Sequence, residues 1–526
     1  MSNNSAYQLN IEKKSRTEYS ARNTTVGMSA KIIAILMGFI TRVVFTHTLS
    51  EDYVGVNGLF TDILNVLALS ELGIGTAITY ALYKPISENN IEKQKSLMLL
   101  YKRLYRGIAA VVLVLGLLVI PFMDILIKNQ PKVDNLILIY LFYLLNSVVS
   151  YLLIYKKTLI DAYQLSYIGE LCQAIFIVLQ NALQIIILFT THNFFLFVII
   201  LLSCTLLNNI TISVKANRMY PFLKDKNVKP LEADEKNNIK QNIKAMLMHK
   251  VGNVVVTNTD NLLLSSLVGI VSVAIYSNYY LVIGSIHQLL NQTFRGITAS
   301  VGNLGVEESK ERIKRIFESS FFIGQWIFGF AGICLFELLT PFVELSFGSQ
   351  YVFSDSVKLV LCLNFYFTGM RQATLVFRDS LGLFWYDRYK SLFEAIINLV
   401  VSLVLGYFYG VIGIFIGTLI STLTTSFWVE PYILYKQIFK ENPKAYFVKY
   451  LIYMIITFIS WGVTDYFCGL VQGSPIIKLI YCLVICVTIP NLFFLVCYIR
   501  SKEWQFLWRK LIGILTKKFK KENRNE

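Results

Sequence analysis

Hydrophobic stretches long enough to cross a bilayer alternate with short polar segments along almost the whole chain. A transmembrane helix needs roughly 17–25 mostly apolar residues. About fourteen stretches meet this requirement, near residues 30–49, 55–83, 104–127, 134–155, 167–190, 193–214, 246–268, 270–293, 316–340, 356–379, 391–409, 411–435, 446–467 and 477–499. The pattern predicts an all-α polytopic membrane protein with about fourteen transmembrane helices.

Lysines and arginines gather in every second segment between these stretches. One set of segments carries most of them, at Lys84–Arg106, Lys156–Lys157, Lys215–Lys244, Lys310–Arg315, Arg388–Lys390 and Lys436–Lys444. The opposite set holds only Lys128, Lys132, Lys358 and Lys478. By the positive-inside rule both termini are cytoplasmic, and an even number of helices agrees with this topology.

The composition narrows the class further. The chain of 526 residues is 55% hydrophobic, which excludes an ordinary soluble enzyme. Its net charge of +16 lies almost wholly in the predicted cytoplasmic loops and tails, so topology and anionic lipid explain it better than nucleic acid does. Eight cysteines form no CxxC pair and four histidines form no paired-ligand motif, so we expect no metal site and no cofactor.

The longest polar interruption separates six predicted helices from the eight that follow. We expect a cytoplasmic tail, an N-lobe of six helices, a linker, a C-lobe of six helices, a final helix pair and a basic amphipathic tail, at residues 1–28, 29–214, 215–245, 246–436, 446–499 and 500–526. Residues 51–56 resemble residues 270–275, which favours a parallel repeat between the lobes, related by an axis along the membrane normal. The C-terminal tail alternates aromatic and basic residues, so it either lies on the inner membrane surface or docks against the protein's own loops.

Polar residues at helical spacing inside apolar spans mark the candidate site, because each needs a cavity or a partner there. Such residues occur on the second, fifth, seventh and eighth predicted helices, at Asn65, Gln180, Asn253, Thr257, Asn278 and Gln288. Amide groups both donate and accept hydrogen bonds, as sugar hydroxyls do. The same amides also join helices inside membranes, so each of them either contacts a glycan or holds two helices together.

Four charged positions complete the candidate site. Arg42 and Asp260 lie deep in the first and seventh predicted helices, where retaining a charge costs on the order of 3 kcal/mol. They either pair with each other or line a central aqueous cavity. Arg371 lies either near the inner mouth of that cavity or at the cytoplasmic headgroups. Glu71 is either a protonatable relay or a buried acid held by hydrogen bonds, so Asp260 and Glu71 are the candidates for ion coupling.

Three segments resemble a known family. Residues 69–90 (LSELGIGTAITYALYKPISENN) are similar to the second-helix region of polysaccharide-unit flippases. Residues 258–282 (NTDNLLLSSLVGIVSVAIYSNYYLV) and 298–304 (TASVGNL) are similar to their seventh and eighth helices. These flippases belong to the superfamily that also holds multidrug MATE antiporters and lipid II flippases.

The resemblance implies a fold and a function. The expected fold has two six-helix bundles with parallel pseudo-symmetry around a central cavity, plus two C-terminal helices. The expected function is alternating-access transport of an undecaprenyl-diphosphate-linked oligosaccharide, from the inner to the outer leaflet of the bacterial plasma membrane, for capsule or other cell-surface polysaccharide. Membrane lipids and the polymerase and glycosyltransferases of the same pathway are the expected partners. The driving force would be an H⁺ or Na⁺ gradient or the membrane potential.

Two other classes of protein compete with this interpretation. A MATE-type cation-coupled multidrug antiporter, or another lipid antiporter, shares the fold, but acids rather than arginines would then dominate its cavity. A polysaccharide polymerase or ligase would be an enzyme with a large catalytic outer loop, and this chain has only short outer loops. The absence of a GxxxxGK[ST] phosphate loop argues against ATP-driven export. We therefore expect a transporter and not an enzyme.

Overall fold

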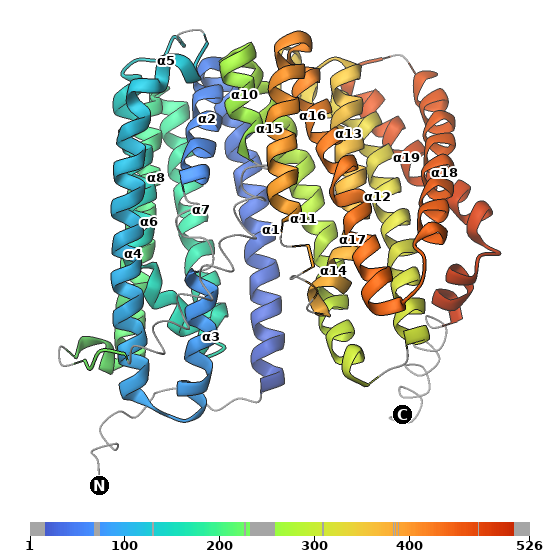
Figure 1. Ribbon diagram of the computed structural model, residues 1–526. Coiled ribbons are helices and arrows are strands. Elements are labelled where there is room, and N and C mark those ends of the chain that lie inside the picture. Colours follow the sequence, from blue (N-terminus) through green and yellow to red (C-terminus); the bar gives the residue numbers. More distant parts are fainter. Residues whose placement is uncertain are drawn as a thin grey trace, which may run out of the picture. The chain divides into compact units, whose positions relative to one another are not determined.

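The structure is a computed structural model that describes residues 16–509, except 68–73, 129–130, 226–227, 232–257, 308–309, 382, 384–385, 388 and 472. All regular elements in this part of the chain are helices (Figure 1). Eleven of the described helices are long and apolar enough to cross a membrane. The chain divides into two compact units, Met1–Ser277 and Asn278–Glu526, and each is described separately.

The first unit is built from long helices with short connections. Its elements are α1 (Arg16–Thr48), α2 (Glu51–Leu67), α3 (Ile74–Ser87), α4 (Ile91–Val119), η2 (Ile120–Phe122), α5 (Met123–Leu126), α6 (Leu136–Ala162), α7 (Ser166–Thr191), α8 (Phe194–Met219), η3 (Pro221–Lys224), α10 (Asp260–Leu263) and the π-helical turn η4 (Leu264–Val268), followed by the first residues of α11. Helix α1 packs against α7, and α6 packs against α4 and α8.

Local sequence signals explain where these helices begin. The side chain of Asn90 accepts a hydrogen bond from the Lys93 amide at the start of α4. Asn193 does the same for the Leu196 amide at the start of α8. Each side chain thereby satisfies one of the backbone donors that the first helical turn leaves without an intrahelical partner.

Small residues let some helices approach closely. A Cβ atom on Gly55 of α2 would lie 2.3 Å from the carbonyl oxygen of Ile270, at the start of α11. The two segments with similar sequences, 51–56 and 270–275, therefore contact each other at this point. Gly116 of α4 makes a similar contact with Leu144 of α6, and its carbonyl accepts a hydrogen bond from the Tyr140 hydroxyl. Close packing of this kind is typical of helices in membranes.

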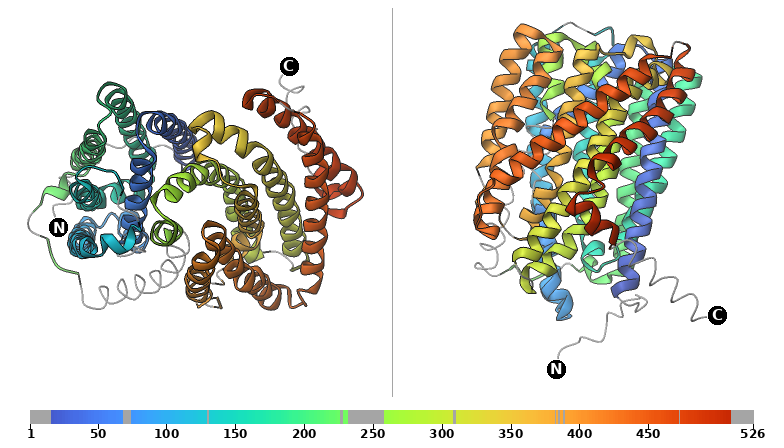
Figure 2. Two further views of the ribbon diagram at one scale, coloured as in Figure 1. Left: turned by 90° about the horizontal axis from the view of Figure 1, so that it is seen from above. Right: turned by 90° about the vertical axis from the view of Figure 1, so that its right-hand side faces the viewer.

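The second unit continues from α11 (Ile270–Glu307). It contains α12 (Lys310–Phe347), η5 (Ser349–Tyr351), α13 (Asp355–Met370), α14 (Gln372–Ser380), α15 (Lys390–Tyr409), α16 (Val411–Thr424), α17 (Ser426–Leu434), the π-helical turn η7 (Tyr435–Phe439), α18 (Lys444–Gly469) and α19 (Pro475–Tyr498). Helices α18 and α19 pack along α12, as the end-on view of Figure 2 shows. A short helix over residues 502–509 follows α19.

Large apolar side chains remain exposed along the outer faces of both units. Leu118 of α4 is 57% exposed and Val484 of α19 is 57% exposed, and many similar residues surround them. A soluble protein rarely leaves such continuous apolar surface in water. Together with the eleven apolar helices, this surface defines a multi-pass membrane protein and confirms the predicted all-α polytopic class. The predicted number of helices and their pseudo-symmetry stay predictions.

Candidate functional site

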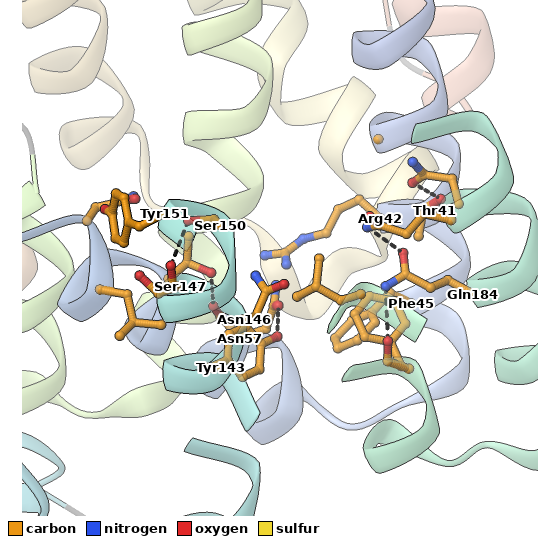
Figure 3. Close-up of a pocket in the computed structure, with 18 residues that line it drawn as sticks. Thr41, Arg42, Phe45, Asn57, Tyr143, Asn146, Ser147, Ser150, Tyr151 and Gln184 are labelled. Carbon is orange, nitrogen blue, oxygen red and sulfur yellow. Dashed lines mark hydrogen bonds between the residues drawn. The ribbon is translucent and has the colours of Figure 1, made fainter. Parts of the chain in front are cut away.

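A polar cavity of about 440 Å³ lies inside the first unit, among α1, α2, α6, α7 and α8 (Figure 3). Its wall carries one cationic side chain, several amides and several hydroxyl groups. The lining residues are Gly38, Thr41, Arg42, Phe45, Asn57, Thr61, Leu64, Asn65, Tyr143, Asn146, Ser147, Ser150, Tyr151, Gln180, Asn181, Gln184, Phe197 and Leu201. None of these lining residues is acidic, so the charge of the wall is positive.

Helical periodicity explains why these side chains meet. The residues from α6 lie at positions 143, 146, 147, 150 and 151, each of them three or four residues from another member, so they occupy one face of that helix. The residues from α1, at positions 38, 41, 42 and 45, follow the same spacing. Each helix therefore turns a polar stripe towards the cavity within an otherwise apolar segment.

Arg42 supplies the positive charge of the cavity. Figure 3 shows its side chain extending from α1 into the space among the surrounding helices. One turn further along α1, the Phe45 ring lies edge-on to Phe194 and Phe197 of α8, with ring centroids 5.5 and 5.1 Å away. This aromatic cluster fixes α1 against α8 and so holds the arginine in position.

Hydrogen bonds make the α7 side of the cavity rigid. The hydroxyl of Thr41 donates to Oδ1 of Asn181 at 2.5 Å, which joins α1 to α7. Gln180 donates to Oε1 of Gln184 at 3.3 Å, and Gln184 donates to the Phe197 carbonyl of α8 at 3.1 Å. Gln184 therefore connects α7 to α8, whereas Gln180 bonds within its own helix, and both amides also line the cavity.

The opposite side of the cavity contains an acceptor that no residue of the described part of the chain satisfies. The hydroxyl of Tyr143 donates to Oδ1 of Asn57, which joins α6 to α2. Oδ1 of Asn146, one turn along α6, is buried and accepts no hydrogen bond within the described part of the chain. A buried acceptor of this kind costs about 1–3 kcal/mol unless a ligand or water satisfies it. The wall therefore contains a polar group that is ready for a hydroxyl or amide donor.

The structure brings together only some of the predicted site residues. Arg42, Asn65 and Gln180 line the cavity. Asn278 and Gln288 both lie on α11 in the second unit; Asn278 is fully buried and Gln288 is exposed. Asn253, Thr257 and Glu71 lie outside the described residues.

Asp260 lies elsewhere in the first unit, within a second polar cluster. It is 6% exposed at the start of α10 and accepts a hydrogen bond from the Tyr276 hydroxyl at 3.3 Å. The next residue, Asn261, donates to Asp62 of α2 at 2.7 Å. Sequence reasoning missed Asp62, although its position three residues before Asn65 puts it on the same side of α2.

Arg371 belongs to a buried ion network in the second unit. Its Nη2 lies 2.7 Å from Oε1 of Glu430 in α17, and its Nη1 lies 3.3 Å from Oε1 of Glu394 in α15. Lys390 also pairs with Glu430, and the Ser426 hydroxyl donates to Glu394 at 2.6 Å. The Glu430 side chain is fully buried, so these contacts balance two cations with two carboxylates away from water.

Sequence analysis did not predict the cavity residues on α6. Tyr143, Asn146, Ser147 and Ser150 are spaced as one helical face within the fourth predicted span, and that spacing would have identified them. The predicted site residues were charged side chains, amides and one threonine on other spans. Serine and tyrosine are less distinctive because both also occur in tightly packed helix contacts.

Comparison with solved structures shows which proteins share this fold. The fold is shared with the lipid II flippase MurJ in its inward closed conformation, with a TM-score of 0.65 and 14% identity over 90% of this chain and 99% of that one. It is also shared with an inward-facing multidrug resistance MATE family transporter of the MOP superfamily, with a TM-score of 0.59 and 15% identity over 78% of this chain and 98% of that one. A mutant of the Vibrio cholerae MATE transporter VcmN gives a TM-score of 0.52 and 16% identity, over 81% of this chain and 99% of that one. The protein therefore has the fold of the MurJ and MATE transporters.

The family follows from the sequence. Residues 20–296, slightly more than half of the chain, match the family model described as polysaccharide biosynthesis protein. The chain belongs to this family. A search of curated proteins found no match.

Proposed function

We propose that this protein is a flippase for undecaprenyl-diphosphate-linked oligosaccharide repeat units in the bacterial plasma membrane. It moves its cargo from the inner to the outer leaflet by alternating access, in the synthesis of capsule or another cell-surface polysaccharide, and both of its termini are cytoplasmic. The observation that carries the proposal is the cavity of the first unit, whose wall combines one arginine with amides and hydroxyls and contains no acid. Family membership supports the polysaccharide pathway.

The chemistry of the wall fits the two parts of such a cargo. A guanidinium group matches the oxygens of a diphosphate through paired hydrogen bonds, so Arg42 would hold the charged group. Amides and hydroxyls match sugar hydroxyls, so Asn65, Asn146 and Gln180 would contact the first sugars. A volume of about 440 Å³ lies within the range of about 300–1,000 Å³ that is typical of ligand sites. The polyprenyl chain would remain in lipid.

Arg371, the other arginine among the predicted site residues, is held by carboxylates of the protein itself. Arg371 is held by Glu394 and Glu430 at 3.3 and 2.7 Å, and its side chain is only 16% exposed. Recruiting it for a diphosphate would leave Lys390 as the one cation of the network beside two buried carboxylates, which is costly. The proposal for diphosphate binding therefore rests on Arg42.

The membrane potential can drive this transport without ATP. Moving two negative charges outward across 100 mV releases roughly 4–5 kcal/mol, at about 2.3 kcal/mol per charge. Ion coupling would add to this driving force through Asp260, which is buried beside the pair formed by Asn261 and Asp62. Glu71 remains a second candidate for coupling to H⁺ or Na⁺.

A multidrug antiporter would require a different cavity. Cationic drugs are stabilised by carboxylates, and a fixed arginine would repel them. The positive, acid-free wall around Arg42 therefore favours an anionic cargo over a cationic one.

The test is a flipping assay in proteoliposomes. A fluorescent undecaprenyl-diphosphate oligosaccharide is first placed in one leaflet. A quencher that cannot cross the membrane then lowers the fluorescence of the molecules that reach the other leaflet. Arg42→Ala should lower the rate about 10- to 100-fold, because hydrogen bonds to charged groups contribute about 1.5–3 kcal/mol.

Two variants control this test. Arg42→Lys keeps the charge but loses the forked geometry, so it should retain an intermediate rate. Arg103→Ala removes an exposed cation of α4 that does not line the cavity, and it should flip normally. A wild-type rate in folded Arg42→Ala, or transport of a cationic dye in place of the lipid-linked sugar, would contradict the proposal.

A further inference from the structure

A second, basic pocket lies at one end of the second unit, between the start of α12 and the short helix over residues 502–509. Its volume is about 320 Å³. The wall contains three cations, two acids, two neutral polar residues and one aromatic ring, from Arg315, Glu318, Ser319, Lys502, Glu503, Gln505, Phe506 and Arg509. None of these residues lines the polar cavity of the first unit.

The short helix is docked on the unit by aromatic and ionic contacts. The Trp504 ring stacks on Trp326 of α12, with ring centroids 5.2 Å apart and planes 18° apart. Trp326 in turn donates to Oδ1 of Asn491 in α19 at 2.9 Å. Glu503 pairs with Lys449 of α18. Residues 502–509 are therefore held against α12 and α18, and the pocket has a fixed second wall.

The cations of the pocket are not neutralised by this docking. Arg315, Lys502 and Arg509 are all exposed, and within the described residues none of them forms an ion pair. One of the two acids, Glu503, is already paired with Lys449. In the described part of the chain, three positive charges thus surround a pocket with one carboxylate, Glu318, that forms no ion pair, so the pocket attracts an anion.

The aromatic residues place the pocket at the depth of lipid headgroups. Trp508 stacks on Trp504 with ring centroids 5.8 Å apart and is itself 52% exposed. Tryptophan is enriched where a membrane protein meets the headgroups. The helix also directly follows the end of the apolar helix α19 at Tyr498. Phe506 adds apolar surface within the pocket, which suits the glycerol and upper acyl chain of a lipid better than a free ion.

We propose that this pocket binds the phosphate of an anionic phospholipid headgroup in the leaflet that faces the C-terminal helix. Basic pockets beside transmembrane helices are known to hold such headgroups. Arg315 would contact the phosphate from α12, while Lys502 and Arg509 would contact it from the short helix. The bound lipid would therefore bridge the two walls of the pocket. The proposal concerns a lipid that is not transported, so it does not depend on the proposed flippase activity.

Native mass spectrometry of the full-length protein in detergent tests this site. The protein is mixed with equal amounts of phosphatidylglycerol and phosphatidylcholine that carry the same acyl chains. Wild-type protein should retain phosphatidylglycerol preferentially. In the triple variant Arg315→Gln, Lys502→Gln, Arg509→Gln, the ratio of retained phosphatidylglycerol to phosphatidylcholine should fall about tenfold. Each cation near the headgroups contributes to the attraction.

A matched triple variant controls for net charge. Lys102→Gln, Arg103→Gln and Arg106→Gln remove the same charge from α4, outside the pocket, and should leave the preference unchanged. Equal retention of phosphatidylglycerol by the wild type and the pocket variant would overturn the proposal. Displacement by inorganic phosphate, or displacement by undecaprenyl diphosphate at lower concentration than phosphatidylglycerol, would also overturn it, since the site would then serve a soluble anion or the cargo.

A second measurement uses the unmodified pocket, in case the triple variant does not fold. In nanodiscs, brominated phosphatidylglycerol should quench tryptophan fluorescence more than brominated phosphatidylcholine does. Trp508→Phe should remove most of this difference, because Trp508 is the exposed ring of the stack beside the pocket. Equal quenching by the two lipids in the wild type would contradict the proposal.

Discussion

Two arginines in the apolar part of this protein have opposite surroundings. Arg371 is enclosed by Glu394 and Glu430, and Lys390 completes a network of two cations and two carboxylates. Arg42 lines a cavity whose other polar residues are all neutral. A charge in a membrane helix needs compensation. For Arg371 two carboxylates supply this compensation, whereas the polar groups that line the cavity beside Arg42 are amides and hydroxyls. An arginine in a membrane helix is therefore not by itself a sign of a binding site. The charge of the neighbouring side chains must be known as well.

Removing a carboxylate from the ion network should have the largest effect on stability. Glu430→Gln leaves Arg371 and Lys390 facing one remaining carboxylate in a buried site. Breaking a buried pair in this way costs about 3–5 kcal/mol. Thermal unfolding in detergent should therefore show a clear loss of stability for Glu430→Gln, and a smaller loss for Arg42→Met.

A surface ion pair offers the matched control for this substitution. Glu441 pairs with Lys314 at 2.5 Å, but its side chain is 49% exposed. Glu441→Gln should change stability by less than about 1 kcal/mol. If Glu430→Gln unfolds at the same temperature as Glu441→Gln, the network does not stabilise the second unit, and the contrast between the two arginines fails.

The surroundings of Arg42 and of Arg371 also differ in how far the sequence could predict them. Arg42 and Gln180 were identified as cavity candidates because each is a polar residue in an apolar stretch, which is a local signal. The partners of Arg371 are 23 and 59 residues away, on α15 and α17. Nothing local relates these positions, since their contact depends on how three helices cross. The helical class and the membrane segments were predictable from apolar length alone, whereas ion pairing required the tertiary structure.

Adding a negative charge to the cavity tests whether its wall selects for an anion. Asn146→Asp places a carboxylate on the α6 wall, where it would repel a diphosphate and compete for Arg42. We expect the flipping rate to fall about tenfold, which corresponds to about 1.4 kcal/mol, and transport of a cationic dye to rise. The measurement is the proteoliposome assay with both substrates.

Asn208 provides the matched comparison for Asn146. It lies on α8, and its Oδ1 is also buried without a hydrogen-bond partner in the described residues, but it does not line the cavity. Asn208→Asp should leave the preference between the two substrates unchanged. An equal change in both variants would mean that the preference follows the charge of the unit as a whole and not the wall of the cavity.

The smallest expected effect concerns the hydrogen bond that fixes the cavity between α1 and α7. Thr41→Val keeps the shape of the side chain but removes the 2.5 Å bond to Oδ1 of Asn181, which is 7% exposed. Hydrogen bonds between helices in membranes contribute about 0.6–2 kcal/mol, so stability should fall by about 1 kcal/mol. Because Arg42 follows Thr41 directly, a looser α1 should also lower the flipping rate by about twofold to threefold. Thr190→Val is the control, since Thr190 is exposed and its hydroxyl, among the described residues, bonds only to the carbonyl of Ile186 on its own helix. Loss of stability in Thr41→Val with an unchanged flipping rate would show that the position of Arg42 does not depend on this bond, and that the aromatic contacts of Phe45 are sufficient to hold it.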